Sequence, residues 1–474
     1  MKRDAITQLL RWKTDSLRKP MLLLGARQVG KTWLMKEFGK QEFSNVAYIR
    51  FDLDEQVKRN FEQDLNIKRL LQVIQLHAGF RLIPGKTLII FDEIQECPAA
   101  LTSLKYFCEE APEYHVMAAG SLLGLYEHKG TGFPVGKVDM MTLYPMSFRE
   151  FLSAIDKELY VELLDSDDET MVNNFSASLT DMLKIYYYVG GMPEAVKAYV
   201  QTGDFNRVRA IHQALLLGYQ RDFSKHAPKE VTPRISLIWD SIPAQLSREN
   251  KKFTCKTVEP GLRMRDLEVA LQWLYDAGLL FSIPRISKPA IPVAAYKEAA
   301  FKTFFLDVGL LAAHAELPAK VILEGNRIFC EFKGALAEQY VQQELRATSG
   351  LTPVYWSADN GRAEVDFIIQ HEMELVPIEV KAESNLQAKS LKVYCRKFHC
   401  AQAIRTSMAL WNEQTMPLDD VGSVCRLINL PLYAVYRAPA ILRVGGGCSR
   451  VRLGRLVEKS CGKCGKDGTC VPKF

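Results

Sequence analysis

The chain has 474 residues and a mass of 53.7 kDa, a length that favours about three domains. Hydrophobic residues make up 48%, charged residues 24% and aromatic residues 10%, close to the averages of folded proteins, which excludes a disordered, collagen-like or coiled-coil chain. Charges interrupt the first apolar residues, and no run approaches the roughly 20 apolar residues that cross a bilayer. We therefore expect a cytoplasmic protein with no membrane partner.

The net charge of +6 is concentrated at one end of the chain. Residues 438–474 hold eight Lys or Arg against two Asp or Glu, so this basic tail accounts for the whole excess and the charge says nothing about partners of the folded body. Four of the eleven cysteines also lie in the tail, at Cys448, Cys461, Cys464 and Cys470. They contain one CxxC, whereas zinc sites usually pair two, so we expect a disordered or non-homologous extension.

The first part of the chain alternates short apolar runs with longer helical patterns. The runs predict strands at residues 21–24, 46–51, 87–91 and 115–119. Strands separated by helices indicate a parallel sheet covered on both faces. Residues 1–155 are therefore predicted to form an α/β core domain.

The next segment, residues 156–227, has a predominantly helical pattern. It is interrupted by Gly190-Gly191-Met192-Pro193, where glycine and proline must break or turn the chain. We expect a helical lid subdomain.

Residues 228–318 change character and predict a winged-helix-like domain. Apolar residues from 267 to 274 fall at helical spacing, Gly278 supplies a helix stop, and residues 279–283 predict a strand. A loop containing Pro284 follows. The alternative interpretation is a generic helical connector.

Residues 319–437 form a further mixed α/β segment. The pattern predicts a helix at 334–347 and paired strands at 365–369 and 375–380, with a turn near 371–374. These elements predict a separate α/β domain.

A phosphate-binding motif directly follows the first apolar run. The pattern GxxxxGKT is formed by Gly25, Ala26, Arg27, Gln28, Val29, Gly30, Lys31 and Thr32. Its glycines allow backbone N–H groups to wrap around phosphate oxygens, and the helix that follows adds its partial positive charge. We expect Lys31 to reach the β- and γ-phosphates of ATP and Thr32 to ligate Mg²⁺.

Two carboxylates end the apolar run at 88–91. Such a run is typical of a central parallel strand, and α/β proteins bind ligands at the carboxyl ends of these strands. We expect Asp92 to hold Mg²⁺ and Glu93 to orient or polarise the attacking water. The structural alternative for this pair is capping of the next helix.

Further polar residues are candidates for contacting the γ-phosphate or for stabilising the charge of the transition state. Ser121 follows the fourth predicted strand and is placed to sense the γ-phosphate, although it could equally cap a helix. Lys137 and Arg149 are candidate cations, which would reach a neighbouring subunit of a homo-oligomer.

A second group of charged residues falls on the C-terminal strands. Residues two apart in a strand share a face, so Glu379 and Lys381 project together, and Asp366 can face them from the neighbouring strand. With Glu338 from the preceding helix, these residues predict a Mg²⁺ site at which Lys381 orients a nucleophile. The alternative is a solvated strand face with ordinary charges, which does not explain the apolar residues on the other face.

Seven motifs occur in order along residues 1 to about 437. They are GARQVGKT (25–32), IIFDEIQ (89–95), AGSLLG (119–124), LYPMSFREFL (143–152), GGMPEAV (190–196), FLDVGLL (305–311), and AEVDFII with PIEVK (363–369 and 377–381). In these motifs the sequence resembles a family of prokaryotic AAA-type ATPases whose C-terminal region is restriction-endonuclease-like. Gly136-Lys137 departs from the Gly-Arg expected there, and the tail after Arg437 lies beyond the expected end.

The resemblance implies an α/β P-loop NTPase core, a winged-helix-like middle and a PD-(D/E)xK-like end. It assigns Lys31, Thr32, Asp92 and Glu93 to ATP, and Glu338, Asp366, Glu379 and Lys381 to the nuclease-like cluster. The implied function is a Mg²⁺-dependent ATPase that couples nucleotide state to a domain binding or cleaving DNA or RNA. The alternative is a regulatory or scaffold ATPase whose nuclease-like domain is inactive and binds protein or DNA.

Overall fold

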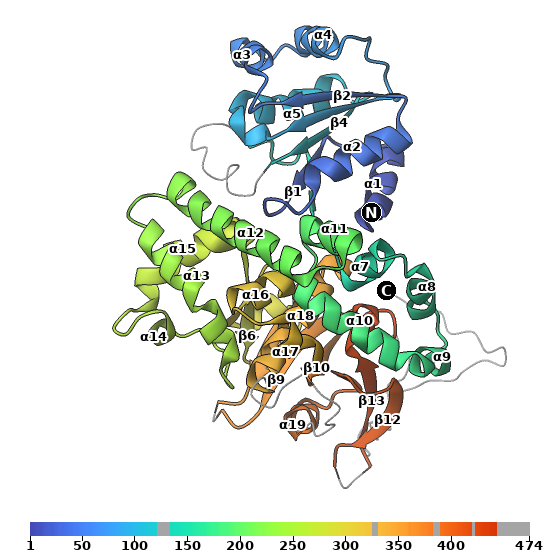
Figure 1. Ribbon diagram of the computed structural model, residues 1–474, viewed down its shortest axis with the longest axis vertical. Helices are drawn as coiled ribbons and strands as arrows, with labels where there is room; N and C mark the ends of the chain where they lie inside the picture. Colours follow the sequence, from blue (N-terminus) through green and yellow to red (C-terminus); the bar gives the residue numbers. More distant parts are fainter. Residues whose placement is uncertain (121–132, 325–329, 360, 383–388, 420–421, 443–474) are drawn as a thin grey trace, which may run out of the picture.

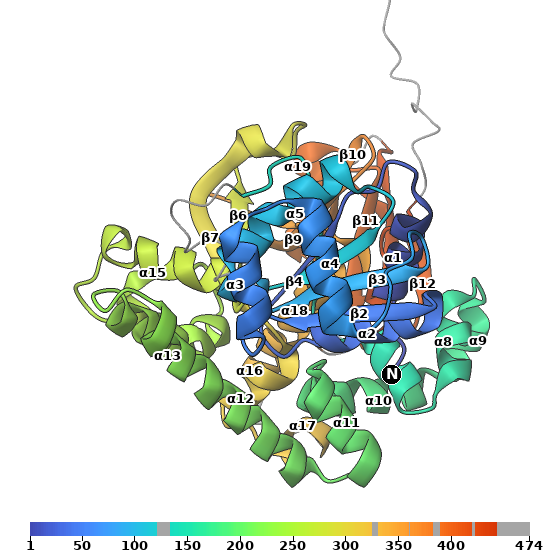
Figure 2. The ribbon, with the colours of Figure 1, turned by 90° about the horizontal axis from the view of Figure 1, so that it is seen from above.

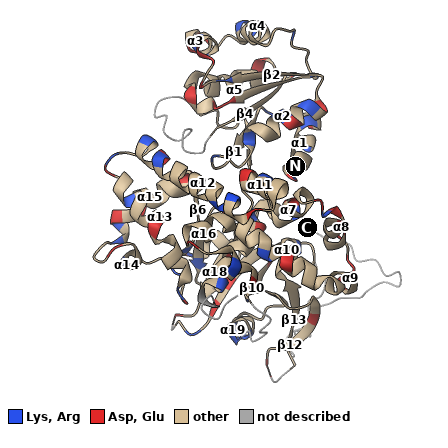
Figure 3. Ribbon diagram, viewed as in Figure 1, with Lys and Arg blue, Asp and Glu red and all other residues tan. Residues whose placement is uncertain are grey.

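A computed structural model of the protein describes residues 1–120, 133–324, 330–359, 361–382, 389–419 and 422–442 (Figure 1). Its strands form two sheets, one near each end of the molecule, and helices of the central part of the chain lie between them. Both signs of charge are distributed over all parts of the ribbon (Figure 3). No helix within the described ranges is both long and apolar enough to cross a membrane.

The N-terminal sheet is parallel throughout, as predicted, with the strand order β2-β3-β4-β1-β5. Its strands are β1 (Met21–Leu24), β2 (Asn45–Arg50), β3 (Thr87–Asp92), β4 (His115–Ala119) and β5 (Asp139–Thr142). All residues of β1, β3 and β4 are buried, which explains their continuous apolar sequences. Strand β5 was not predicted, because this edge strand buries a single residue.

Helices cover both faces of this sheet (Figure 2). They are α1 (Ala5–Thr14), α2 (Lys31–Glu42), α3 (Glu55–Gln63), α4 (Ile67–Ala78) and α5 (Pro98–Glu110), with a short 3-10 helix η1 (Ile94–Glu96). Alternate strand residues point to opposite faces, so Leu23 and Ile90 pack in the core that contains α1 and α2. Leu22 and Ile89 pack instead beneath α3, α4 and α5.

The central part of the chain is helical, and its predicted interruption is confirmed. Its helices are α7 (Phe148–Ala154), α8 (Glu158–Asp165), α9 (Glu169–Asn174), α10 (Ser176–Val189), α11 (Pro193–Thr202), α12 (Phe205–His226) and α13 (Thr232–Ser247). Between α10 and α11, Gly190 has a φ of 67° and an added Cβ would collide with the carboxylate of Asp307. The same carboxylate accepts the Gly191 N–H at 2.7 Å, so this turn packs tightly against the later chain.

The second sheet is mixed and has the order β12-β13-β11-β10-β9-β8-β6-β7. Its strands are β6 (Leu280–Ile286), β7 (Lys297–Phe305), β8 (Val354–Ser357), β9 (Glu364–His371), β10 (Glu374–Val380), β11 (Gln402–Ser407), β12 (Asn412–Pro417) and β13 (Val424–Pro431). The hairpin of β6 and β7 joins the later strands through the parallel pair Arg285–Tyr355. Pro284, expected in a loop, lies within β6, where a register shift accommodates its missing N–H.

The remaining helices precede, join or follow the strands of the second sheet. They are α14 (Cys255–Val258), α15 (Met264–Asp276), α16 (Val308–His314), α17 (Ala319–Glu324), α18 (Cys330–Ser349) and α19 (Lys389–Phe398), with 3-10 helices η2 (Val293–Tyr296) and η4 (Leu432–Arg437). Helix α18 packs against α13, α16, β7, β10 and η4 and buries several polar side chains. Among these, Glu344 accepts the Phe148 N–H at 2.8 Å and Gln343 accepts the Val308 N–H at 2.9 Å.

Candidate functional site

The loop between β1 and α2 has the backbone shape that a phosphate cradle requires. Gly25 has a φ of 144°, and an added Cβ would collide with the backbone oxygen of Leu143. Gln28 and Gly30 also have positive φ, of 65° and 96°. Only glycine fits at position 25, and the loop delivers the chain to the N-terminus of α2, where backbone N–H groups can bind an anion.

Lys31 begins α2 and turns back over the loop. Its Nζ donates to the backbone oxygens of Gly25 at 3.0 Å and Ala26 at 2.8 Å. Burial lowers the pKa of Lys31 to about 8, although the carboxylates of Glu93 and Asp92 oppose this effect. The predicted phosphate-binding lysine is therefore held in the loop by carbonyl groups that a phosphate can replace as partners.

Thr32 and Asp92 meet beside Lys31. The Thr32 hydroxyl donates to Asp92 Oδ2 at 2.8 Å, and the Tyr48 hydroxyl donates to the same oxygen at 2.7 Å. The carboxyl end of β3 thus brings together the two oxygen ligands predicted for Mg²⁺. Tyr48, on the neighbouring strand β2, was missed in the sequence because an isolated tyrosine in a strand has no motif.

Glu93 stands at the turn immediately after β3. Its φ is 51°, an uncommon value for a residue other than glycine, and such conformations often occur at functional sites. Gln95 Nε2 donates to Glu93 Oε2 at 2.5 Å and fixes the carboxylate. This places a carboxylate beside the pair formed by Asp92 and Thr32.

Helix α12 contacts the loop between β1 and α2 at Arg27. Arg27 forms an ion pair with Asp222, and its Nη2 lies 3.2 Å from His226 Nε2. The Tyr219 hydroxyl donates to Arg27 O at 2.9 Å. Three residues of α12 therefore hold the middle of this loop in place.

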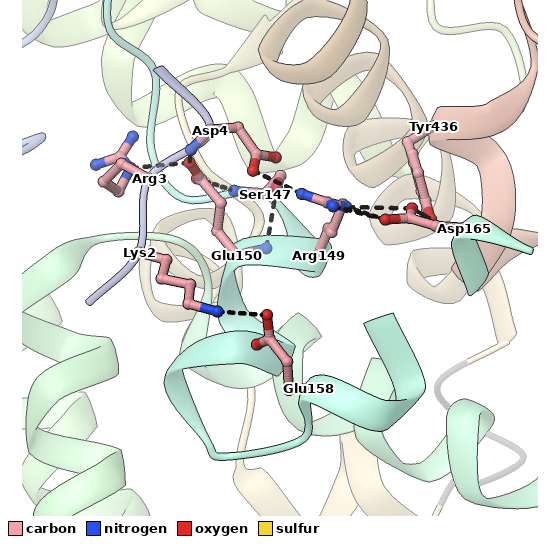
Figure 4. Close-up of polar contacts among 9 residues, drawn as sticks. All are labelled: Lys2, Arg3, Asp4, Ser147, Arg149, Glu150, Glu158, Asp165 and Tyr436. Atoms are coloured by element: carbon pink, nitrogen blue, oxygen red, sulfur yellow. Dashed lines mark hydrogen bonds and ion pairs between the residues drawn. The ribbon is translucent and has the colours of Figure 1, made fainter. Parts of the chain in front are cut away.

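Arg3 is a buried cation that supports the same loop from the other side. Its Nη1 donates to Val29 O at 3.0 Å, and its Nη2 donates to Tyr144 O at 2.7 Å. Its Nε lies 3.1 Å from Glu150 Oε1, and Glu150 Oε2 accepts the Ser147 N–H at 3.0 Å (Figure 4). No motif identifies Arg3 in the sequence, but Tyr144, Ser147 and Glu150 all belong to the motif LYPMSFREFL.

A hollow of about 430 Å³ lies between the start of the chain and α2. Its walls include Met1, Ile6 and Trp33, and Trp33 directly follows Thr32 in the nucleotide motif. The Trp33 side chain is 40% exposed. Its exposure and position next to the phosphate-binding motif make it a candidate surface for a planar ring.

The candidate cations Lys137 and Arg149 are paired within their own chain. Lys137 Nζ lies 2.9 Å from Glu109 Oε1. Arg149 forms ion pairs of 2.6 Å with both Asp4 and Asp165 (Figure 4). In this arrangement the structure therefore does not bring either side chain to the nucleotide loop as an unpaired cation.

Two predicted features lie outside the described residues. Ser121, the candidate sensor, is in the segment 121–132, and the tail cysteines are in the segment 443–474.

The four predicted residues of the C-terminal group do come together. Lys381 Nζ lies 2.7 Å from Glu379 Oε1, and Asp366 Oδ2 accepts the Val380 N–H at 2.8 Å. Glu338 projects from α18, and its negative charge contributes to raising the pKa of both Asp366 and Glu379. We call Glu338, Glu364, Asp366 and Glu379 the acidic cluster.

Two lysines that the sequence reasoning missed enter the acidic cluster. Lys302 on β7 is fully buried, and its Nζ lies 2.5 Å from Glu364 Oε1. Lys251 Nζ lies 2.6 Å from Glu338 Oε1. Neither lysine is near these carboxylates in sequence, so no local pattern indicates the contact.

Burial and neighbouring charges shift the pKa values of the cluster's carboxylates in different directions. Burial, reinforced by Glu338 and Glu379, raises the pKa of Asp366 to about 8. Burial would also raise the pKa of Glu338, but Lys251 and Lys302 hold it below its ordinary value. In the part of the chain that the structure describes, no group of three or more His, Cys, Asp or Glu side chains is arranged to hold a metal ion.

Three family models match successive parts of the chain. The model described as AAA domain matches residues 17–152. Residues 180–321 and 333–433 match two models that are each described as a domain of unknown function, DUF8612 and DUF4143. Residues 17–152 are therefore similar to AAA domains, and the parallel sheet and the loop between β1 and α2 in this part of the chain are those of a P-loop fold. A search of curated proteins finds no match.

Solved structures that match part of this chain have low sequence identity to it. A Walker-type ATPase of Pyrococcus abyssi is 14% identical, with a TM-score of 0.41, and the match covers 66% of this chain and 95% of that one. The Orc1 protein of Aeropyrum pernix in complex with DNA is 13% identical, with a TM-score of 0.28 and coverage of 67% and 93%. The RuvB Holliday junction branch migration motor of Thermotoga maritima is 12% identical, with a TM-score of 0.30 and coverage of 59% and 89%.

Proposed function

We propose that this protein binds ATP with Mg²⁺, hydrolyses it, and couples its nucleotide state to the C-terminal region. The observation that carries the proposal is the meeting of Thr32 and Asp92 beside Lys31, beneath a loop that requires glycine at position 25. A hydroxyl and a carboxylate side by side are the oxygen ligands that Mg²⁺ prefers, so the residues present fit this ion.

Each residue of the site has a role in this proposal. The loop from Gly25 to Gly30 wraps the phosphates, and Lys31 exchanges its carbonyl partners for phosphate oxygens. Thr32 and Asp92 hold Mg²⁺, which, when bound, neutralises charge on the β- and γ-phosphates. Glu93 orients the attacking water and accepts its proton.

We place the base of ATP in the hollow between the start of the chain and α2. Its volume of about 430 Å³ lies in the range of ligand pockets, and Trp33 offers an aromatic face next to Thr32.

In this proposal, the bound nucleotide controls the activity of the C-terminal region of the same chain. The element order α18-β8-β9-β10-α19-β11, with β9 and β10 antiparallel and β10 and β11 parallel, supports a PD-(D/E)xK nuclease-like domain. Helices α13, α14 and α15 followed by the hairpin β6-β7 support a winged-helix-like domain before it. Both domain types bind DNA in many proteins, so we propose DNA or RNA as the macromolecular ligand.

ATP hydrolysis by the purified protein tests the proposal. We expect Mg²⁺-dependent phosphate release that falls at least about a hundredfold in Lys31→Ala and in Glu93→Gln. Glu93→Gln should still bind ATP, because it leaves Lys31, Thr32 and Asp92 in place. Lys40→Ala, on an exposed position of the same helix α2, is the matched control and should be unaffected. Equal, background-level release by the wild type and Lys31→Ala would contradict the proposal.

A further inference from the structure

The acidic cluster already surrounds a cation that belongs to the protein. Lys302 Nζ lies 2.5 Å from Glu364 Oε1 and 3.6 Å from both Glu338 Oε2 and Asp366 Oδ1. The Lys302 side chain is 0% exposed. An ammonium group enclosed by three carboxylates takes the position where their combined attraction for a cation is greatest. A hard divalent ion needs the same position and the same oxygens.

Two further carboxylate oxygens of the cluster have lysine partners, whereas Asp366 Oδ2 accepts the Val380 N–H and the buried Glu379 Oε2 has no hydrogen-bond partner among the described residues. Lys251 Nζ lies 2.6 Å from Glu338 Oε1, and Lys381 Nζ lies 2.7 Å from Glu379 Oε1. Three lysines therefore oppose the four carboxylates, which leaves one formal negative charge. Adding a divalent ion without displacing a lysine would leave the buried cluster with excess positive charge, which is costly in a low dielectric.

The lysines and the carboxylates come from different parts of the chain. Lys302 lies on β7, and the segment that carries Lys251 runs beside this strand. The backbones of Lys252 and Lys302 form an isolated antiparallel β-bridge, and the Phe253 N–H donates to Phe301 O at 2.8 Å. The carboxylates lie on α18, β9 and β10. The ion pairs therefore also fasten residues 251–302 to the C-terminal strands.

We infer that Lys302, supported by Lys251, is the resident cation of the acidic cluster, so that the C-terminal domain in this arrangement takes up no divalent metal and does not cleave nucleic acid. The residues present do not fit the metal site implied by a nuclease-like fold, since the ligands assigned to Mg²⁺ are engaged by ammonium groups. This inference rests on the nuclease-like part of the proposed function and is independent of ATP hydrolysis.

Binding of Mn²⁺ to the full chain without nucleotide tests the inference directly. Free Mn²⁺ is measured by electron paramagnetic resonance for the wild type, Asp366→Asn and Lys31→Ala. We expect the wild type and Asp366→Asn to bind the same number of Mn²⁺ ions, because the acidic cluster takes up none. A site that disappears in Asp366→Asn but persists in Lys31→Ala would overturn the inference. A site that persists in Asp366→Asn lies elsewhere and leaves the cluster metal-free, as inferred.

Removing the resident cation gives the second test. Lys302→Met keeps much of the side-chain length and leaves the carboxylates without their central partner. We expect a lower Tm that Mn²⁺ raises by at least a few degrees, because the metal replaces the ammonium group, while the Tm of the wild type does not respond. Lys297→Met, at an exposed position of the same strand β7, is the control and should behave as the wild type.

A folded Lys302→Met protein that neither binds Mn²⁺ nor gains Tm from it would show that Lys302 is not what keeps the metal out. This outcome would overturn the inference. If Lys302→Met does not fold, the comparison of the wild type with Asp366→Asn decides by itself. The ATPase rate of the wild type, measured on the same preparation, separates failure of this inference from failure of the proposed ATPase.

Discussion

Gly25 is the residue at which the nucleotide loop has least space. Its φ of 144° and the nearby Leu143 carbonyl leave no room for a Cβ. Gly25→Ala is expected to lose about 1–3 kcal/mol of unfolding free energy and at least tenfold in ATP affinity, because the loop must shift. Denaturant unfolding and ATP titration measure the two effects.

Gly79→Ala is the matched control for Gly25→Ala. Gly79 ends α4 with a φ of 76°, but an added Cβ would meet nothing within 4 Å. This change should cost about 1–2 kcal/mol of backbone strain and leave ATP affinity unchanged. Equal ATP affinities in the two variants would mean that the close approach at Gly25 does not shape the site.

Glu344 makes stability depend on pH. Burial raises the pKa of this carboxyl to about 8, from an ordinary value of 4.5. Between these two values the folded protein holds a proton that the unfolded chain has lost, so the free energy of unfolding falls as pH rises and levels off above about 8. Glu344→Gln keeps an acceptor for the Phe148 N–H and has no charge to bury.

We therefore expect Glu344→Gln to be more stable than the wild type by on the order of 3 kcal/mol at pH 8, with the difference shrinking towards pH 5. Urea unfolding of both proteins at several pH values checks this. A difference that stays constant from pH 5 to pH 8 would rule out Glu344 as the titrating group.

At the scale of elements, the N-terminal segment is fastened to the nucleotide loop by Arg3. Arg3 and Glu150 are only 4% and 7% exposed, so Arg3→Met leaves a buried carboxylate unpaired. We expect a loss of about 3–5 kcal/mol in urea unfolding and weaker ATP binding, because Val29 O also loses its donor. Arg3→Lys should restore little, since its single nitrogen replaces three guanidinium nitrogens that each donate to a different acceptor.

The control for Arg3 is its neighbour Lys2. Lys2 pairs with Glu158, but these side chains are 74% and 43% exposed. Exposed pairs contribute about 0–1 kcal/mol, so Lys2→Met should be close to neutral. Similar losses in Lys2→Met and Arg3→Met would show that the buried position of Arg3 is unimportant.

Uniform burial explains why three of the strands were predicted from the sequence. Strands β1, β3 and β4 are buried along their whole length and therefore appear as apolar runs. Strands β5 and β12 lie at sheet edges with mostly exposed or half-buried residues, and they have no such run. Edge strands form because a neighbour offers hydrogen bonds, which a local pattern does not record.

The same distinction separates the predicted site residues from the missed ones. Lys31 and Thr32 lie in a contiguous motif, and Asp92 and Glu93 end a recognisable strand. Arg3 reaches the nucleotide loop only through tertiary contacts. The lysines of the acidic cluster likewise meet their carboxylates across different elements, so the sequence predicted the anions of that cluster without their cations.

At the scale of the whole molecule, α18 joins parts of the chain that lie far apart in sequence. Tyr340 on this helix is fully buried and contacts the rings of Phe148, Tyr186 and Tyr187, with centroids 5.4–6.4 Å away. We expect Tyr340→Ala to cost about 3–5 kcal/mol and to shift the unfolding of both sheets together. Tryptophan fluorescence and far-ultraviolet circular dichroism should therefore report the same lower midpoint.

Tyr340→Phe separates packing from hydrogen bonding. Within the described ranges the buried Tyr340 hydroxyl has no hydrogen-bond partner. Its removal should therefore be neutral or slightly stabilising. A loss in Tyr340→Phe as large as that in Tyr340→Ala would mean that the hydroxyl, rather than the ring, holds α18 in place.

The hairpin β6-β7 belongs to the same sheet as β8 to β13. This limits where the chain can be cut to express its C-terminal part alone. A recombinant fragment that begins at α18 would lose Lys251 and Lys302 and would expose the edge of β8 that pairs with β6. Exposed strand edges promote aggregation. Soluble expression of the C-terminal half should therefore require a start upstream of residue 251, whichever boundary sequence comparison suggests.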